Sequence, residues 1–70
     1  MNEYIKFSSV SAAQKARMML MRQGVRSMVG KNPSPKKSEG CSFALFVDDA
    51  QAADMALKTK GILSKGTGRL

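Results

Sequence analysis

The sequence predicts an α+β domain of the ferredoxin-like class, in which an antiparallel sheet carries two helices on one face. Short β-prone runs alternate with two stretches whose apolar residues recur at helical spacing, and their order along the chain is β-α-β-β-α-β. A chain of 70 residues is too short for more than one compact core. We therefore expect residues 1–70 to form a single ferredoxin-like domain.

A strand, a helix and a second strand are expected in the first half of the chain. The alternation in Tyr4–Phe7 is typical of a strand, and Ser8–Ser9 supply N-cap residues for a helix over Val10–Gln23. Gly24 marks the end of this helix, because glycine is favoured just past a helix terminus. Val25–Val29 is the second predicted strand. The buried face of the helix is expected to consist of small or apolar residues: Ala12, Ala13, Ala16, Met19 and Leu20.

A long polar segment separates the two halves. Gly30–Gly40 contains two prolines, several lysines and no large apolar residue, so it predicts a basic loop. A loop of about eleven residues is long for a compact domain, and such loops often carry function.

The second half of the chain repeats the pattern. Ser42–Val47 is the strongest strand signal, and Asp48–Asp49 supply the N-terminal cap of a helix over Ala50–Lys60. We expect Ile62–Leu63 to begin a short last strand or tail, and the glycine-containing segment Lys65–Leu70 to be frayed. The inward face of this second helix is predicted to carry Ala53, Ala56 and Leu57.

The alternation of side chains in the strands predicts which residues face the helices. The residues assigned to the helix side are Ile5, Phe7, Ala44 and Phe46, and those assigned to the open side are Tyr4, Lys6, Cys41, Phe43 and Leu45. Exposed Tyr4, Phe43 and Leu45 would form an apolar patch, and such patches mark interfaces. A homodimer that associates through the sheet is plausible on this ground.

Composition excludes several classes of function. The chain has a net charge of +7, one Cys and no His. Without His, neither a Cys-His or Ser-His catalytic pair nor the usual transition-metal sites can form, so we expect a protein that is not an enzyme and holds no metal or cofactor. The charge favours anionic partners, although it also serves general solubility.

The chain also gives expectations about location. No apolar run approaches the length of a membrane span, and a single Cys fits a reducing compartment. A cytoplasmic protein without membrane contacts is therefore expected. Met18 and Met55 fall on outward helix faces, where methionine can be tolerated or can serve partner binding.

Cys41 is the candidate for chemistry. It follows Gly40, which gives backbone freedom, and it precedes Ser42 at the start of the third strand. Lys36 and Lys37 lie shortly before it, and nearby positive charge stabilises a thiolate. A thiolate here could accept a sulfur or selenium atom as a persulfide-type adduct. The alternative is an inert small residue that merely begins a strand.

The order of elements, with Gly-Cys-Ser-Phe-Ala-Leu-Phe-Val at residues 40–47 after a Pro- and Ser-containing loop, resembles a selenium/sulfur carrier-like family of small bacterial proteins. The resemblance extends to Tyr4–Phe7 and to Gly24–Val25 after the first helix. It implies that Cys41 carries the chalcogen, with a cysteine-desulfurase-like donor and an acceptor protein as partners. Ser42 stands where that family often has Gly.

Two other interpretations remain open. RNA-recognition domains have the same element order and stack bases on open-face aromatics, for which Tyr4, Phe43 and Phe46 are candidates. Glu39 and Cys41 depart from that motif, since they replace a basic and an aromatic residue, so nucleic acid is the less favoured partner. The other interpretation is a sheet-mediated interaction domain in which Cys41 is inert.

Overall fold

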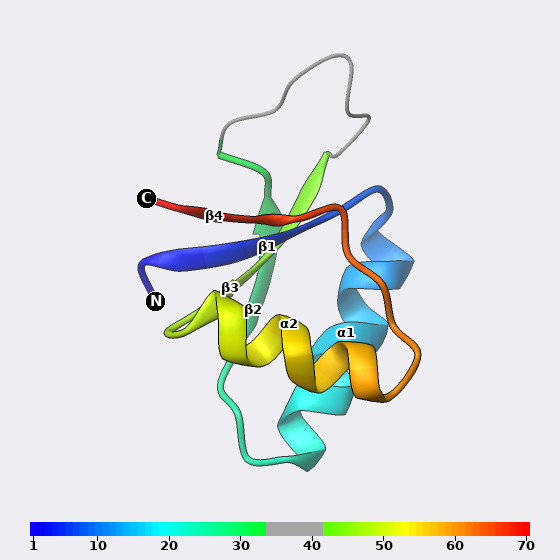
Figure 1. The fold of residues 1–70 in the computed structure, drawn as a ribbon. Coiled ribbons are helices and arrows are strands. Elements are labelled where there is room, and N and C mark those ends of the chain that lie inside the picture. The colour runs from blue at the N-terminus through cyan, green and yellow to red at the C-terminus, as the bar shows by residue number, and fades with distance from the viewer. Residues whose placement is uncertain (34–41) are drawn as a thin grey trace.

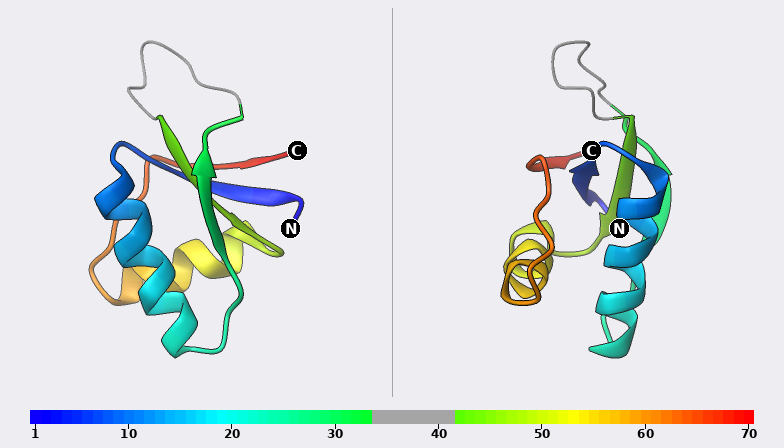
Figure 2. Two further views of the ribbon diagram at one scale, coloured as in Figure 1. Left: turned by 180° about the vertical axis from the view of Figure 1, so that it is seen from behind. Right: turned by 90° about the vertical axis from the view of Figure 1, so that its right-hand side faces the viewer.

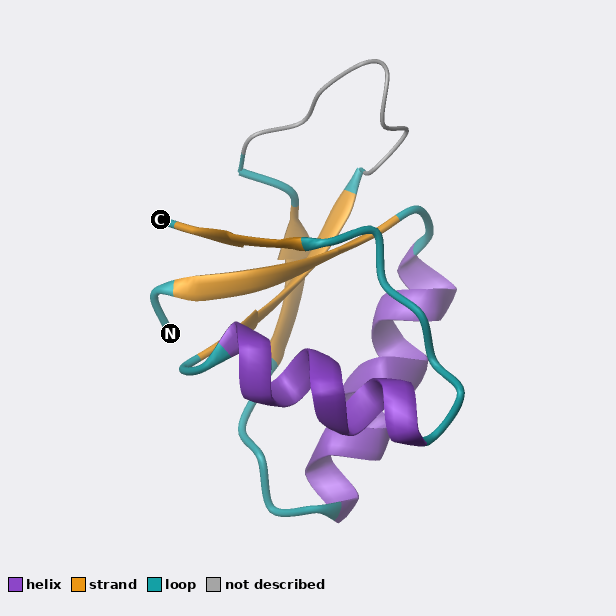
Figure 3. Ribbon diagram, in the orientation of Figure 1, coloured by secondary structure: helices purple, strands orange, loops and turns teal. Residues whose placement is uncertain are grey.

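The computed structural model describes residues 1–33 and 42–70. Its elements follow the predicted order (Figures 1 and 3). They are β1 (Glu3–Phe7), α1 (Val10–Arg22), β2 (Met28–Lys31), β3 (Phe43–Val47), α2 (Ala50–Thr59) and β4 (Thr67–Arg69). Neither helix in the described ranges is long and apolar enough to cross a membrane.

The four strands form one antiparallel sheet in the order β2-β3-β1-β4. The connection from β1 through α1 to β2 leaves a space between these two strands, and β3 occupies it, which defines the split β-α-β arrangement. α1 packs over β2 and β3, and α2 packs over β1 and β4 (Figure 2). The fold is therefore the ferredoxin-like α+β fold that the sequence predicts.

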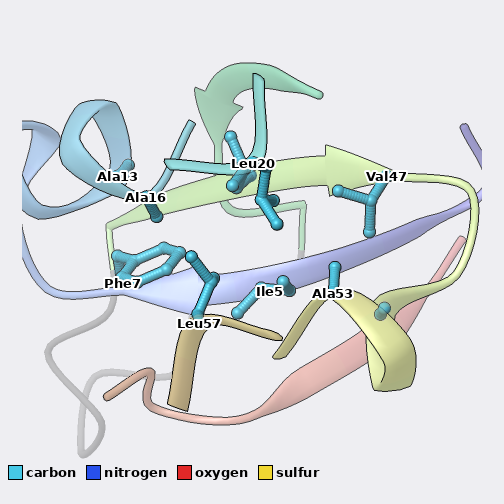
Figure 4. Close-up of a cluster of buried hydrophobic side chains, with 10 residues drawn as sticks. Ile5, Phe7, Ala13, Ala16, Leu20, Val47, Ala53 and Leu57 are labelled. Carbon is cyan, nitrogen blue, oxygen red and sulfur yellow. The ribbon is translucent and has the colours of Figure 1, made fainter. Parts of the chain in front are cut away.

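One hydrophobic core joins both helices to one face of the sheet (Figure 4). Small alanines in the helices let the backbones approach the sheet, while Phe7, Leu20 and Leu57 fill the volume between them. The complete buried cluster consists of Ile5, Phe7, Ala13, Ala16, Leu20, Leu45, Val47, Ala50, Ala53 and Leu57. All the residues that the sequence assigned to the buried helix faces belong to this cluster or pack against it.

Both helices begin with the side-chain caps that the sequence predicts. Ser9 Oγ accepts a hydrogen bond from the Ala12 N–H at 3.1 Å, and Asp49 Oδ1 accepts one from the Ala52 N–H at 3.0 Å. Each bond satisfies a backbone donor that has no partner inside its own helix. The starts of both helices are thus fixed by local sequence.

The second strand begins later than predicted because Val25 completes the end of α1. Gly24 adopts a φ of 78°, its N–H donates to Met21 O at 3.0 Å, and the Val25 N–H donates to Leu20 O at 2.9 Å. These two bonds form a Schellman motif, in which the residue after the glycine packs back onto the helix. The strand therefore runs over Met28–Lys31, and the first two residues of the predicted Gly30–Gly40 loop belong to the sheet.

The last strand was also predicted in the wrong place, for the same reason. After Gly61, whose φ is 79°, the Ile62 N–H donates to Leu57 O at 3.0 Å and ends α2 in a second Schellman motif. β4 instead forms over Thr67–Arg69, within the tail that was expected to fray, and pairs with β1. Tertiary pairing thus orders a segment whose glycines suggested disorder.

The prediction of which β3 side chains face the helices was wrong by one residue. Phe43 pairs with Phe7 and Leu45 pairs with Ile5, so both lie on the helix side, and Leu45 is fully buried in the core. Residues directly opposite in an antiparallel pair share a face. The predicted open-face patch of Tyr4, Phe43 and Leu45 therefore does not exist.

The residues of β1 and β3 that alternate with these helix-facing pairs lie on the open face. Tyr4 lies opposite Phe46, and Lys6 lies opposite Ala44. Phe46 was expected to enter the core, but its ring lies over Gly30 of β2, where an added Cβ would come within 2.8 Å of its Cε2 atom. Glycine in the edge strand therefore makes room for this aromatic ring on the open face.

Candidate functional site

The candidate carrier residue lies outside the described residues. This holds for Cys41 and also for Gly40, Lys36 and Lys37, which were predicted to support it. Of the predicted set, Ser42 is described, and it is exposed. The candidate site is therefore built from the chain segments that lead into and out of residues 34–41.

Those two segments are joined by a backbone hydrogen bond. The Asn32 N–H donates to Ser42 O at 3.1 Å, immediately beyond the last paired residues of β2 and β3, Lys31 and Phe43. Asn32 is buried, and Phe43 packs against the hydrophobic core. The residue that follows Cys41 in the sequence is thus anchored to the sheet through both its own backbone and its neighbour.

Lysines gather at this end of the sheet. Lys31 ends β2 beside Phe43, and Lys6 lies opposite Ala44 near the start of β3. Lys65 joins them, because its N–H donates to Lys6 O at 2.9 Å. The backbone register therefore brings cations from three separate segments to the end where Ser42 lies, at the top of the sheet in Figure 1.

Three of the four acids in the described ranges lie at the other end of the sheet. Glu3 pairs with Val47 at the opposite end of β1 and β3, and Asp48 and Asp49 follow Val47 directly. Asp54 lies in α2, where it accepts a hydrogen bond from Ser64. Glu3, Asp48 and Asp49 are therefore separated from Ser42 by the length of β3, and the sequence alone could not show this separation.

The open face offers little aromatic surface for stacking. Tyr4 is only 5% exposed, and its ring centroid lies 6.0 Å from that of Phe46, which is partly exposed. Phe43 faces the helices. Of the three aromatics considered for an RNA-recognition surface, only Phe46 is both on the open face and partly accessible, whereas such surfaces stack two or three bases.

Sequence reasoning missed a groove between α1 and the outer edge of β2. This α1–β2 groove has a volume of about 390 Å³ and is lined by Gln14, Arg17, Met18, Met28 and Val29. The sequence places Met18 on an outward helix face, but it does not show that Met28, which belongs to β2, lines the same groove. The two methionines come together only because α1 packs over β2.

No group of three or more metal-ligating side chains occurs within residues 1–33 and 42–70. Comparison of the chain with protein-family models, with curated proteins and with solved structures found no match.

Proposed function

We propose that this protein carries a sulfur or selenium atom on Cys41 and passes it between partner proteins. The observation that carries the proposal is the surroundings of the next residue, Ser42. Its backbone is anchored to Asn32, and Lys6, Lys31 and Lys65 gather at the same end of the sheet. An anchored chain position in a cationic environment suits a thiol that must react as thiolate.

The transfer step is a thiol–persulfide exchange. The Cys41 thiolate attacks the outer, sulfane sulfur of a persulfide on a donor protein's cysteine. A new S–S bond forms at Cys41 while the donor's S–S bond breaks, and the donor cysteine leaves as a thiolate. The proton of the transferred SH group stays with it, and no external oxidant or reductant is required. The same exchange in reverse delivers the atom to an acceptor thiolate.

The partners supply the remaining chemistry in this proposal. A cysteine-desulfurase-like protein is the donor class that the sequence resemblance implies, and the acceptor is a second protein. The carrier is not itself an enzyme, and it acts in the cytoplasm, where a reducing environment keeps Cys41 available as a thiol.

The direct test is intact mass measurement after incubation with a donor protein whose cysteine is loaded as a persulfide or, for selenium, as a selenopersulfide, so that the donor cysteine leaves as a thiolate in either case. We expect a gain of one sulfur or one selenium atom that dithiothreitol removes, and no gain in Cys41→Ser. A protein that gains no reducible mass under conditions that load the donor would refute the carrier function.

A relocated cysteine tests whether the position matters. In the double variant Cys41→Ser with Gln51→Cys, the thiol lies on exposed α2, near Asp48 and Asp49. We expect this variant to load more slowly than the native chain. Equal loading rates would mean that any exposed thiol serves and would remove the support that the cationic end provides.

A charge test completes the design. Lys31→Glu should slow loading of Cys41, because it reverses a charge at the end of the sheet where Ser42 lies. Arg22→Glu makes the same change at the far end of α1 and should leave the rate unchanged.

A cellular assay tests the alternative of an interaction domain with an inert cysteine. If Cys41→Ser keeps a cellular function of the protein in full, this interpretation replaces the carrier.

A further inference from the structure

The outer edge of β2 is open within the described part of the chain. β2 is the first strand of the sheet order and pairs only with β3 there. Because the Asn32 N–H bonds to Ser42 O, the pairs formed by Met28 and Gly30 with β3 are the hydrogen-bonded ones. The N–H and C=O groups of Val29 and Lys31 therefore point outward, and this edge can accept another strand.

The α1–β2 groove runs beside this edge. In Figure 2 α1 lies alongside β2 at the rim of the sheet. Arg17 lines both this groove and a second depression of about 440 Å³ that extends past Met21 to the turn at residues 24–27. A segment added to β2 would therefore have one row of its side chains directed toward a hollow flank of α1.

The lining of these two depressions combines apolar surface with positive charge. Met18, Met21 and Met28 are 53%, 55% and 61% exposed, respectively. Arg17 and Arg26 provide the charges. The residues that line the two depressions in the described ranges include no Asp or Glu. Flexible methionine side chains adapt to varied apolar partners, and arginine binds carboxylates with two parallel hydrogen bonds.

We propose that the edge of β2 and the α1–β2 groove bind an extended acidic peptide segment of a partner protein, which adds to the sheet as a fifth strand. Backbone hydrogen bonds to Val29 and Lys31 hold the segment. Its side chains alternate between the two faces of the sheet. In the row that faces α1, apolar groups contact Met18 and carboxylates pair with Arg17, while the other row lies on the open face beside Met28. The proposed contacts do not include Cys41, and the proposal does not depend on the carrier function.

Charge favours an acidic peptide over a second copy of this chain. Each copy has a net charge of +7, and pairing two β2 edges would bring two copies of Arg17 near each other without a lining acid to offset them. The lining also favours a peptide over RNA. It offers methionines for apolar contact, and no aromatic side chain in the described ranges lines either depression for base stacking.

The test uses a fluorescent peptide about eight residues long, so that it spans β2, with threonine at every second position and leucine and glutamate alternating at the others. The row that faces α1 then carries both leucine and glutamate. Binding to the full-length protein is measured by fluorescence anisotropy, and amide exchange is followed by NMR. In the free protein the Val29 and Lys31 amides should exchange quickly, while the Met28 and Gly30 amides should be protected by β3. Peptide binding should protect Val29 and Lys31.

Matched controls separate strand addition from nonspecific attraction. The same peptide with N-methyl groups on alternate residues, placed so that its pairing edge lacks N–H donors, should lose binding at least about tenfold, a factor that corresponds to one or two hydrogen bonds. Arg17→Glu should weaken binding by a similar factor, whereas Lys60→Glu, the same charge change at the end of α2, should have a much smaller effect. Cys41→Ser should bind normally.

Several outcomes would overturn the proposal. These are undiminished binding of the N-methylated peptide, equal binding of the same peptide with lysine in place of each glutamate, and peptide protection at amides other than those of Val29 and Lys31. Protection of these two amides in the free protein, with a dimer seen by sedimentation, would assign the edge to a second copy. If single-stranded RNA displaces the peptide, protects the Val29 and Lys31 amides and binds more tightly than the peptide, the edge binds nucleic acid instead.

Discussion

The Tyr4 ring lies directly over Gly68 of β4 on the open face of the sheet. A Cβ added to Gly68 would lie 2.8 Å from Tyr4 Cε2 and would overlap its Cζ and hydroxyl oxygen. Glycine at this position lets the ring lie flat across the edge strand, which explains why Tyr4 is buried on a face that no helix covers. Gly68 lies in the segment that the sequence predicts to be frayed, but in the structure it packs against Tyr4 as part of the sheet.

Gly68→Ala should destabilise the protein by about 1–3 kcal/mol, because the added methyl group must displace the Tyr4 ring. The measurement is urea unfolding of a double-mutant cycle with Tyr4→Ala. In the Tyr4→Ala background the cost of Gly68→Ala should largely disappear, since the ring that the methyl group meets is gone. A cost that stays the same in both backgrounds would mean that the glycine is needed for backbone conformation only.

Leu45→Ala tests the register of β3. Leu45 is fully buried beside Ile5, so its truncation should cost about 2–5 kcal/mol in free energy of unfolding. Leu63→Ala makes the same chemical change at a leucine that is 77% exposed and should stay within about 0.5 kcal/mol of the native protein. Similarly small effects in both variants would mean that Leu45 lies on the open face.

Two serine substitutions should have opposite signs. Ser9→Ala removes the N-cap of α1 and should cost about 1 kcal/mol. The Ser27 hydroxyl oxygen is buried and has no hydrogen-bond partner in the described structure, so Ser27→Ala should be neutral or stabilise by up to about 1 kcal/mol. Thermal unfolding of both variants checks the comparison, and a loss of stability in Ser27→Ala would reveal a partner for that hydroxyl group.

Asp54 ties the connection before β4 to α2. Its Oδ1 accepts the Ser64 hydroxyl at 2.7 Å, and Ser64 Oγ in turn accepts the Gly66 N–H at 3.3 Å. Asp54→Ala should cost about 1–3 kcal/mol and speed amide exchange at Gly68, because β4 loses its anchor. Asp54→Asn keeps an acceptor for Ser64 and should cost less.

The control for Asp54 is Asp48→Ala, which removes an exposed ion pair to the N-terminal amine at 3.2 Å. Such pairs contribute at most about 1 kcal/mol and are screened by salt, so β4 exchange should not change. Faster β4 exchange in Asp48→Ala as well would mean that the strand responds to charge in general and not to its tie to Asp54.

The candidate carrier site was predictable only as a local motif. The sequence places Cys41 between a basic loop and a β-prone run, and the sequence resemblance implies the carrier role that we propose for it. Neither observation could show that Lys6 and Lys65, distant in the chain, approach the start of β3, because this depends on strand pairing. The α1–β2 groove was beyond prediction for the same reason, since Met18 and Met28 meet only when α1 packs on the sheet.

The sequence by itself determined the order of elements, the starts of both helices and the alanine faces that α1 and α2 bury. These features depend on short-range effects, namely side-chain caps and the 3.6-residue period of apolar positions. Tertiary structure decided the face of each β3 side chain, the late start of β2 and the position of β4. A strand's pattern fits either face when apolar residues are adjacent, as in Ala44–Val47, and only its partner's register selects one.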